Sequence, residues 1–203
     1  MRARTSISTL LAAVMIAACA SDGPTGLDDR LGAAAEQPVL DGQIAASSIV
    51  TEFPAGPVIP GASAWIARSE NGVNVRLQTN GLTPGHAYTL WVVPFNNPEN
   101  CIVPDACVLA DALANDPAVA VDLINGTGLV VGGSGQATFA ARTKVGDLGI
   151  RGIGLLDALG SEIHLVVRDH GPKLPGSAQL AEFGGGCDVY PCANVQLAAS
   201  FGN

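Results

Sequence analysis

The sequence has few aromatic residues and little positive charge. Phe, Trp and Tyr make up 4% of the 203 residues, and the only lysines are Lys144 and Lys173. The 18 acidic residues outnumber the 10 basic ones, which gives a formal net charge of −8. An acidic surface repels the phosphate backbone, and no run of basic residues offsets that repulsion. We therefore expect no nucleic-acid partner. The shortage of aromatic rings also weakens a sugar-binding interpretation.

The familiar catalytic signatures are missing as well. The chain contains no His-Glu-x-x-His pattern for a zinc protease, no Gly-x-Ser-x-Gly nucleophile elbow and no Gly-Lys-Ser/Thr phosphate loop. The glycine-rich segment 132–135 lacks the lysine of a phosphate loop, so we interpret it as a hairpin loop. No cofactor is expected from these motifs.

The amino end is apolar, but the apolar run is too short to cross a membrane. Arg2 and Arg4 precede a mostly apolar stretch from Ile7 to Ala18, and no acidic residue occurs before Asp22. A membrane-spanning helix needs about 20 apolar residues. A charged start, a short apolar stretch and a small-residue exit are typical of a secretory signal, which we assign to residues 1–18.

The segment Ile16-Ala17-Ala18-Cys19 ends this apolar stretch. It resembles the lipobox of bacterial lipoprotein signal peptides, in which an aliphatic and two small residues precede a cysteine. The resemblance implies that the Cys19 thiol carries diacylglycerol, that cleavage occurs just before it, and that fatty acids such as palmitate anchor the chain to a membrane. Ala20, rather than Asp, implies the outer membrane where two membranes exist. The alternative is an ordinary secretory signal with a chance cysteine.

We interpret residues 19–38 as a flexible tether. They are rich in Ala, Gly, Asp and Pro and contain no aromatic residue, so they cannot bury enough apolar surface to order themselves. A flexible coil of this length reaches roughly 25 Å. We expect one folded domain over residues 39–203, held outside the cytoplasm at the cell envelope.

Four further cysteines lie in that domain, namely Cys101, Cys107, Cys187 and Cys192. An even number in an exported chain predicts two disulfides. Three pairings are possible, and the short spacings favour 101 with 107 and 187 with 192. A four-cysteine zinc site is the alternative, although such sites usually have two to four residues between paired cysteines, and here there are five and four.

The domain alternates short apolar segments with Gly- and Pro-rich turns. We predict strands over 62–69, 73–79, 86–93, 119–124, 129–131, 136–143, 162–168 and 195–201. A tight turn at Asn71-Gly72 joins the first two strands, and one short helix covers 105–114. Val73, Val75 and Leu77 alternate with polar residues, which is typical of a strand with one buried face. This pattern predicts an all-β fold, an antiparallel β-sandwich of immunoglobulin-like or jelly-roll-like type, with one long disulfide-braced loop over 94–117.

The stretch Gly81-Leu82-Thr83-Pro84-Gly85-His86-Ala87-Tyr88-Thr89-Leu90 resembles the loop-to-strand element of fibronectin-type and other immunoglobulin-like sandwiches. It is also similar to the Gly-Leu-x-Pro-Gly element that precedes a metal-bearing strand in superoxide-dismutase-like sandwiches. That family needs a His-x-His pair on the strand, whereas this chain has Tyr88 two residues after His86. The resemblance therefore implies the fold without copper chemistry. The domain as a whole also resembles exported bacterial proteins whose activity is uncharacterised.

The most suggestive polar residues lie on the predicted strand 162–168. Ile163, Leu165 and Val167 share one face and suit the core, while Glu162 and His164 share the other. We expect this second face to be solvated. The alternative is that Glu162 and His164, with His86 as a third candidate, ligate a metal or act as an acid–base pair. His170 would lie about 20 Å from His164 on a straight strand, too far to share one ion.

Two functions follow from these patterns. The first is a non-enzymatic binding or structural module at the envelope, whose partner is a protein, a peptide or a glycan. The second is a metal-dependent or hydrolytic enzyme centred on Glu162 and His164. The sequence favours the first, because no catalytic signature supports the second.

Overall fold

The computed structural model describes residues 44–176, 178–180, 187 and 190–200. The predicted signal segment 1–18 with Cys19 and the predicted tether 19–38 lie outside the described residues. Within the described part of the chain, no helix has the length and apolarity that crossing a membrane requires.

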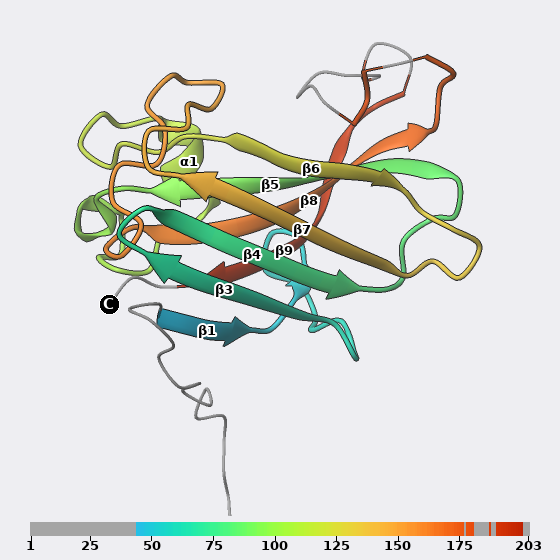
Figure 1. Ribbon diagram of the computed structural model, residues 1–203, viewed down its shortest axis with the longest axis horizontal. Coiled ribbons are helices and arrows are strands. Elements are labelled where there is room, and N and C mark those ends of the chain that lie inside the picture. The colour runs from blue at the N-terminus through green and yellow to red at the C-terminus, as the bar shows by residue number, and fades with distance from the viewer. Residues whose placement is uncertain (1–43, 177, 181–186, 188–189, 201–203) are drawn as a thin grey trace, which may run out of the picture. The chain divides into compact units, whose positions relative to one another are not determined.

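Two antiparallel sheets pack face to face, which confirms the predicted β-sandwich (Figure 1). The four-stranded sheet has the order β1 (Ile44–Ser48), β3 (Ser63–Ser69), β4 (Gly72–Thr79) and β7 (Ala137–Lys144). The five-stranded sheet has the order β2 (Thr51–Glu52), β9 (Ala193–Ser200), β8 (Glu162–Pro172), β5 (His86–Phe95) and β6 (Ile124–Val130). A 3-10 helix, η1 (Pro98–Asn100), and the helix α1 (Leu109–Ala114) lie in the long connection between β5 and β6.

The hairpin between β3 and β4 turns at Glu70 and Asn71, one residue before the predicted Asn71-Gly72 turn. Gly72 has a φ of +147°, and a Cβ atom there would lie 2.3 Å from the carbonyl oxygen of Thr143 on β7. The position therefore needs glycine both for its backbone and for its close approach to the neighbouring strand.

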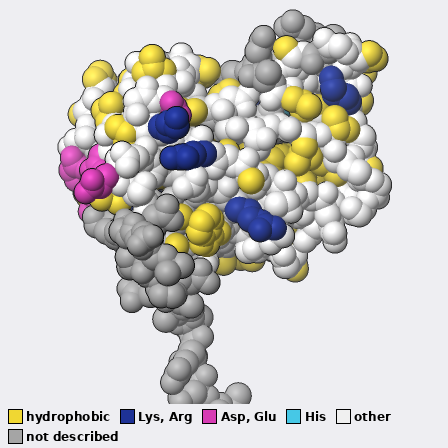
Figure 2. All heavy atoms as spheres, viewed as in Figure 1, with side chains coloured by type: hydrophobic (Ala, Val, Ile, Leu, Met, Phe, Trp, Pro, Cys, Tyr) yellow, Lys and Arg dark blue, Asp and Glu magenta, His cyan; other side chains and the backbone are white. Residues whose placement is uncertain are grey.

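The main core lies between the two sheets. Every second residue of β4 points into it, as the alternating pattern predicted. Its large, fully buried side chains include Ile66, Leu77, Leu90, Phe139, Leu155 and Leu165. The outer face of the four-stranded sheet faces solvent: Arg76 and Arg142 are exposed there, and Figure 2 shows a few basic side chains on this side of the molecule.

The outer face of the five-stranded sheet is covered by a second, smaller core. The connection from β5 to β6 folds back over this face and places Cys101, Cys107, Val119 and Val121 against side chains of β5. As a result β5 is buried on both faces, from Ala87 to Phe95.

The long connection differs from the prediction in two places. The helix is shorter than 105–114, because Asp105 has a φ of +58° and Val108 is still extended before α1 begins at Leu109. The predicted strand 119–124 is mostly loop, because Ala120 has a φ of +53° and only one isolated bridge, from Val121 to Phe95, precedes β6.

Both local cysteine pairings are present as disulfides. Cys101 is bonded to Cys107, with Cα atoms 5.3 Å apart, and Cys187 is bonded to Cys192, with Cα atoms 5.2 Å apart. The first bond lies in the connection between β5 and β6, and the second lies in the connection between β8 and β9.

Candidate functional site

A cavity of about 820 Å³ lies on the outer side of the five-stranded sheet. Its floor consists of residues from β5, β8 and β9 that point away from the main core. One wall is α1 with the Cys107 end of the disulfide loop, and others come from residues 53–55 and 150–151. The lining is mostly apolar and includes Phe53, Trp91, Val93, Phe95, Leu109, Leu113, Leu123, Ile150, Val166 and Leu197. This size and character are those of a small-molecule site.

Two ionisable side chains on β8, Glu162 and His164, lie together in this apolar cavity. The Nε2 atom of His164 is 2.5 Å from Oε1 of Glu162, and the His164 ring packs at 4.7 Å against the ring of Phe95. Glu162 is 1% exposed and His164 is 6% exposed. The predicted solvated face is therefore wrong, because α1 and the disulfide loop cover it. The predicted pairing of the two side chains is present.

Two groups compensate the buried carboxyl group of Glu162. Its Oε2 atom accepts a hydrogen bond from the Cys107 backbone N–H at 3.0 Å. Arg68 on β3 is 2% exposed, and its guanidinium donates to the carbonyl oxygens of Ala158 and Ser161. Burial lowers the pKa of Arg68 to about 10, although the nearby carboxylates of Glu162 and Asp157 act to raise it. The guanidinium thus stays cationic at neutral pH and offsets a negative charge on Glu162.

The second ring nitrogen of His164, Nδ1, has no hydrogen-bond partner in the part of the chain that the structure describes. A neutral imidazole whose Nε2–H donates to Glu162 carries a lone pair on Nδ1, and a protonated one carries a second N–H. In either state the cavity contains one polar atom available to a ligand.

A cation also lines the cavity further along β8. The side chain of Arg168 is half-buried and donates to the Asn194 side chain at 3.4 Å. Burial lowers the pKa of Arg168. Among the described residues, no third His, Cys, Asp or Glu joins Glu162 and His164 in a group that could hold a metal ion. The pair by itself is a poor metal site.

The structure places His86 away from the cavity, so it does not join Glu162 and His164 in the alternative three-residue centre. His86 is at the start of β5, where it pairs with Pro172, whereas His164 pairs with Val93 at the other end of that strand. Seven residues of strand, about 23 Å, separate the two positions.

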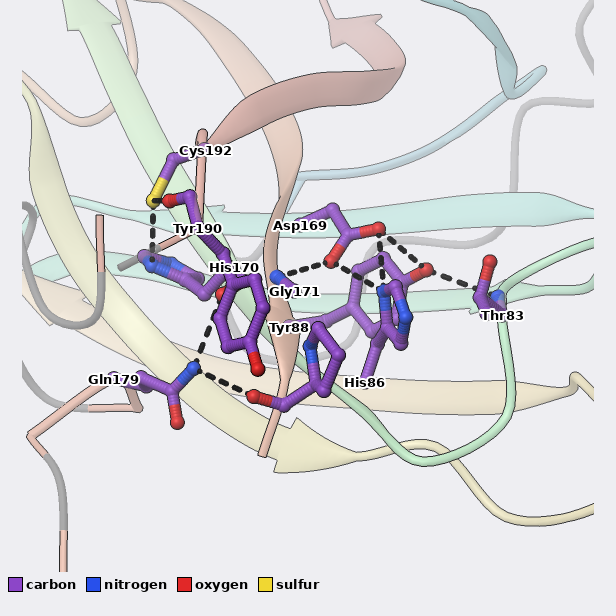
Figure 3. A network of polar contacts seen from close by, with 10 residues as sticks. Thr83, His86, Tyr88, Asp169, His170, Gly171, Gln179, Tyr190 and Cys192 are labelled. Carbon is purple, nitrogen blue, oxygen red and sulfur yellow. Dashed lines mark hydrogen bonds and ion pairs between the residues drawn. The ribbon is translucent and has the colours of Figure 1, made fainter. Parts of the chain in front are cut away.

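His86 belongs instead to a polar network with Asp169 and Tyr88 (Figure 3). Its Nδ1 atom is 3.0 Å from the Asp169 carboxylate, the Tyr88 hydroxyl donates to the same carboxylate at 3.0 Å, and the Thr83 N–H donates to the Tyr88 oxygen at 2.9 Å. Burial raises the pKa of Tyr88, and the Asp169 carboxylate adds to the effect although the Thr83 hydrogen bonds oppose it. The phenol therefore stays protonated and ties the loop before β5 to the end of β8.

A hollow of about 440 Å³ lies at the ends of β4 and β7. Its lining residues include Gln78, Thr79 and Asn80 but no titratable side chain. Unlike the cavity beside α1, it contains no group that could transfer a proton or bind a ligand through a charge.

Sequence reasoning missed the cavity itself, although one signal pointed to it. The segment from Leu90 to Phe95, Leu-Trp-Val-Val-Pro-Phe, is apolar without alternation. A continuous apolar run is typical of a strand buried on both faces. Together with the long connection after it, this run indicates a second layer over the sheet.

Comparisons with known proteins give only a distant likeness. No family model matches the chain, and no curated protein matches it. Among solved structures, a SOD-like protein from Bacillus subtilis aligns with 75% of this chain and 96% of its own, at 18% identity and a TM-score of 0.34. A double mutant of a SOD-like protein from Bacillus subtilis aligns with 75% of this chain and 95% of its own, at 18% identity and a TM-score of 0.35.

Proposed function

We propose that this chain is an exported, lipid-anchored envelope protein whose β-sandwich binds a small apolar molecule bearing one polar group. The observation that carries the proposal is the cavity of about 820 Å³ with His164 Nδ1 as an open polar atom in its apolar lining. Two disulfides are consistent with an oxidising compartment outside the cytoplasm. The lipobox-like segment before Cys19 supplies the anchor.

The charge arrangement favours a ligand whose polar group donates a hydrogen bond. When the Nε2–H of a neutral imidazole at His164 donates to the Glu162 carboxyl group, the Nδ1 atom is an acceptor. A hydroxyl or amine on the ligand satisfies that acceptor, and the apolar lining buries the rest. A lipid anchor at Cys19 would hold the cavity close to a membrane, where apolar molecules with such head groups are concentrated.

The test uses the exported chain, released from the membrane by proteolysis within residues 20–38. An apolar fluorescent amine, N-phenyl-1-naphthylamine, reports binding at pH 8. Two competitors displace this probe: 1-decanol, and the methyl ether of 1-decanol, which cannot donate a hydrogen bond. We expect 1-decanol to bind about fivefold more tightly, since a net hydrogen bond contributes roughly 1 kcal/mol.

The matched variants are His164→Phe, which keeps a ring but removes the nitrogens, and His86→Phe, which lies outside the cavity. His164→Phe should abolish the preference for the alcohol and leave binding of the ether unchanged, while His86→Phe should keep the preference. Absence of saturable probe binding, or an alcohol preference that survives in His164→Phe, contradicts the proposal.

The Glu162–His164 pair also favours a second candidate function, acid–base catalysis on a bound ligand. A histidine oriented by a carboxylate, with its other nitrogen open to a cavity, can transfer a proton. This candidate predicts that the ligand is recovered chemically altered, and that His164→Phe binds it without altering it.

A further inference from the structure

A second cluster of reactive side chains lies at the far end of β8, apart from the cavity pair. His170 is fully buried, and its Nδ1 atom is 3.4 Å from Sγ of Cys192 and 3.9 Å from Sγ of Cys187. The imidazole nitrogen and the two sulfurs all lie within 4.8 Å of one another. Both cysteines are half-buried, so the sulfurs are within reach of a small reagent. Figure 3 shows the His170 ring pointing at Cys192.

We propose that reduction of the Cys187–Cys192 disulfide creates a binding site for a thiophilic divalent cation, Zn²⁺ in the first instance, with His170, Cys187 and Cys192 as ligands. Thiolate and imidazole are the ligands that zinc prefers, and two cysteines with one histidine leave a fourth position for water. Four residues separate the two cysteines, which is within the usual spacing of a zinc-binding pair.

The opposite nitrogen of His170 is already held in the way a metal ligand requires. Nε2 is 2.8 Å from Oγ1 of Thr89, and that same oxygen accepts a hydrogen bond from Nε1 of Trp91 at 2.8 Å. A hydroxyl oxygen has two lone pairs and one hydrogen. Thr89 can therefore donate to Nε2 or accept from it, and it supports either tautomer of His170.

The two tautomers correspond to two states of the site. With the disulfide closed, a proton on Nδ1 lets His170 donate a weak hydrogen bond to Cys192 Sγ. With the cysteines reduced, a proton on Nε2 turns the Nδ1 lone pair toward the thiolates and the metal. Metal-bound histidines usually donate their other N–H in this manner, which fixes the ring and the tautomer.

Neighbouring residues hold the His170 backbone in place independently of any metal. The side-chain amide of Gln179, itself fully buried, donates to the carbonyl oxygens of His170 and Pro172 at 3.0 and 3.1 Å. Gly171 has a φ of +76°, and a Cβ atom there would lie 2.6 Å from Cβ of Tyr190. The absence of that Cβ lets Tyr190, two residues before Cys192, lie against β8.

Reduction of the Cys187–Cys192 disulfide balances when a dithiol is the reductant. The dithiol is oxidised to its disulfide and gives two hydrogen atoms to Cys187 and Cys192, which become thiols. Both thiols then release a proton to solvent as Zn²⁺ binds. Two thiolates, a neutral imidazole and Zn²⁺ form a site of zero net charge, which suits its burial.

The test uses the full chain in detergent, reduced by a phosphine that does not compete for metal, with Co²⁺ as a spectroscopic probe and Zn²⁺ as its competitor. The oxidised chain should bind neither ion at this site. The reduced chain should give a thiolate-to-cobalt absorption band that one equivalent of Zn²⁺ removes. The variant C101S/C107S should keep this band, because the other disulfide has no part in the site.

His170→Ala should weaken Zn²⁺ binding by more than about 100-fold, beyond the range found for loss of an outer hydrogen-bond partner, while leaving both thiols titratable. C187S/C192S should abolish the band. Because His170→Ala keeps the native disulfide when oxidised, its folding can be checked before reduction. Equal zinc affinity in the reduced parent and His170→Ala, or a band that persists in C187S/C192S, overturns the proposal.

Discussion

A single buried carboxylate, that of Asp122, organises the loop between β7 and β8. Its two oxygens accept backbone N–H groups at 2.6–2.9 Å from Leu123, Gly149, Arg151, Ile153 and Gly154. Burial acts to raise the pKa of Asp122, but the hydrogen bonds from Arg151, Gly154, Leu123 and Gly149 outweigh it and lower the pKa below its ordinary value of 3.8. The charged form is thus the one that the fold stabilises. The same loop supplies Ile150 and Arg151 to the cavity wall.

Asp122→Asn should destabilise the domain by about 3 kcal/mol at pH 7, because hydrogen bonds to a charged group contribute about 1.5–3 kcal/mol each and an amide cannot accept on both sides. Because the pKa of Asp122 is lower in the folded state than in the unfolded chain, its charge stabilises the fold at pH values above the unfolded-state pKa. That stabilisation is lost as the pH falls through the folded-state pKa. The difference between parent and variant should therefore be constant above pH 5 and shrink below pH 4. Urea unfolding at several pH values measures it.

Asp116→Asn is the matched control for this prediction. Asp116 is exposed and accepts a hydrogen bond from Ala118 within its own turn. An exposed substitution of this kind should change the free energy of unfolding by about 0.5 kcal/mol or less. Equal losses in the two variants would mean that Asp122 has no special part in holding the loop.

The contact between Glu162 and His164 could be predicted from the sequence, but their burial could not. Glu162 and His164 stand two apart on a predicted strand, so their contact follows from strand geometry alone. Their burial depends on α1 and on Cys107, and Cys107 lies 55 residues before Glu162 in the chain. Strand geometry carries no information about that distant layer, so the predicted exposure of this face was wrong.

At the level of elements, β8 has two buried faces that serve different purposes. Ile163, Leu165 and Val167 point into the main core, as predicted, and Leu165 pairs with Val92 and Ala198 on the neighbouring strands. Val166 points to the other side and lines the cavity. Neighbouring residues of one strand should therefore differ in what their removal costs.

Leu165→Ala should destabilise the domain by about 2–4 kcal/mol, because it leaves a hole in the main core that cannot collapse. Val166→Ala should cost about 1 kcal/mol and instead change the affinity for the apolar probe, because it enlarges a cavity that is already open. Denaturant unfolding and probe titration on the same two variants separate the effects. The reverse order would indicate a one-residue register shift in β8, which exchanges its faces.

Local patterns predicted most strands and failed in the long connection. The boundaries of β3, β4 and β7 agree with the prediction within one residue at each end, because alternation and the Asn-Gly turn are local signals. In the connection, the structure depends on Asp122, Asp111 and a disulfide. Asp111 accepts from the N–H groups of Val108 and Ile102, which ties α1 to the Cys101–Cys107 loop. These contacts have no periodic signature in the sequence.

At the scale of the whole domain, the two sites are connected through β5. Trp91 lines the cavity and also donates to Thr89, which holds His170 beside the second disulfide. His170 and Cys187 are 17 residues apart in sequence, so their approach requires the loop between β8 and β9 to fold back over the strand. Sequence spacing alone assigned the cysteines to each other and left the histidine out.

We predict that a lipid anchor at Cys19 attaches the whole domain to a membrane. Cys19→Ser should abolish acylation, since the thiol is the attachment atom implied by the lipobox resemblance. If signal cleavage depends on that modification, the variant should also keep residues 1–18. Each buried methylene of an acyl chain contributes about 0.8 kcal/mol to membrane binding. Loss of several acyl chains should therefore release the protein from the membrane.

Intact-mass spectrometry of the membrane and soluble fractions measures both effects in one experiment. The parent chain should carry the mass of a diacylglycerol on a chain that begins at Cys19, and the variant should lack it. Cys101→Ser serves as the control, because it also replaces a cysteine but leaves the lipobox intact, so its acylation should be unchanged. An unmodified amino terminus at any other residue of the parent chain would refute the anchor and leave the domain as an ordinary secreted protein.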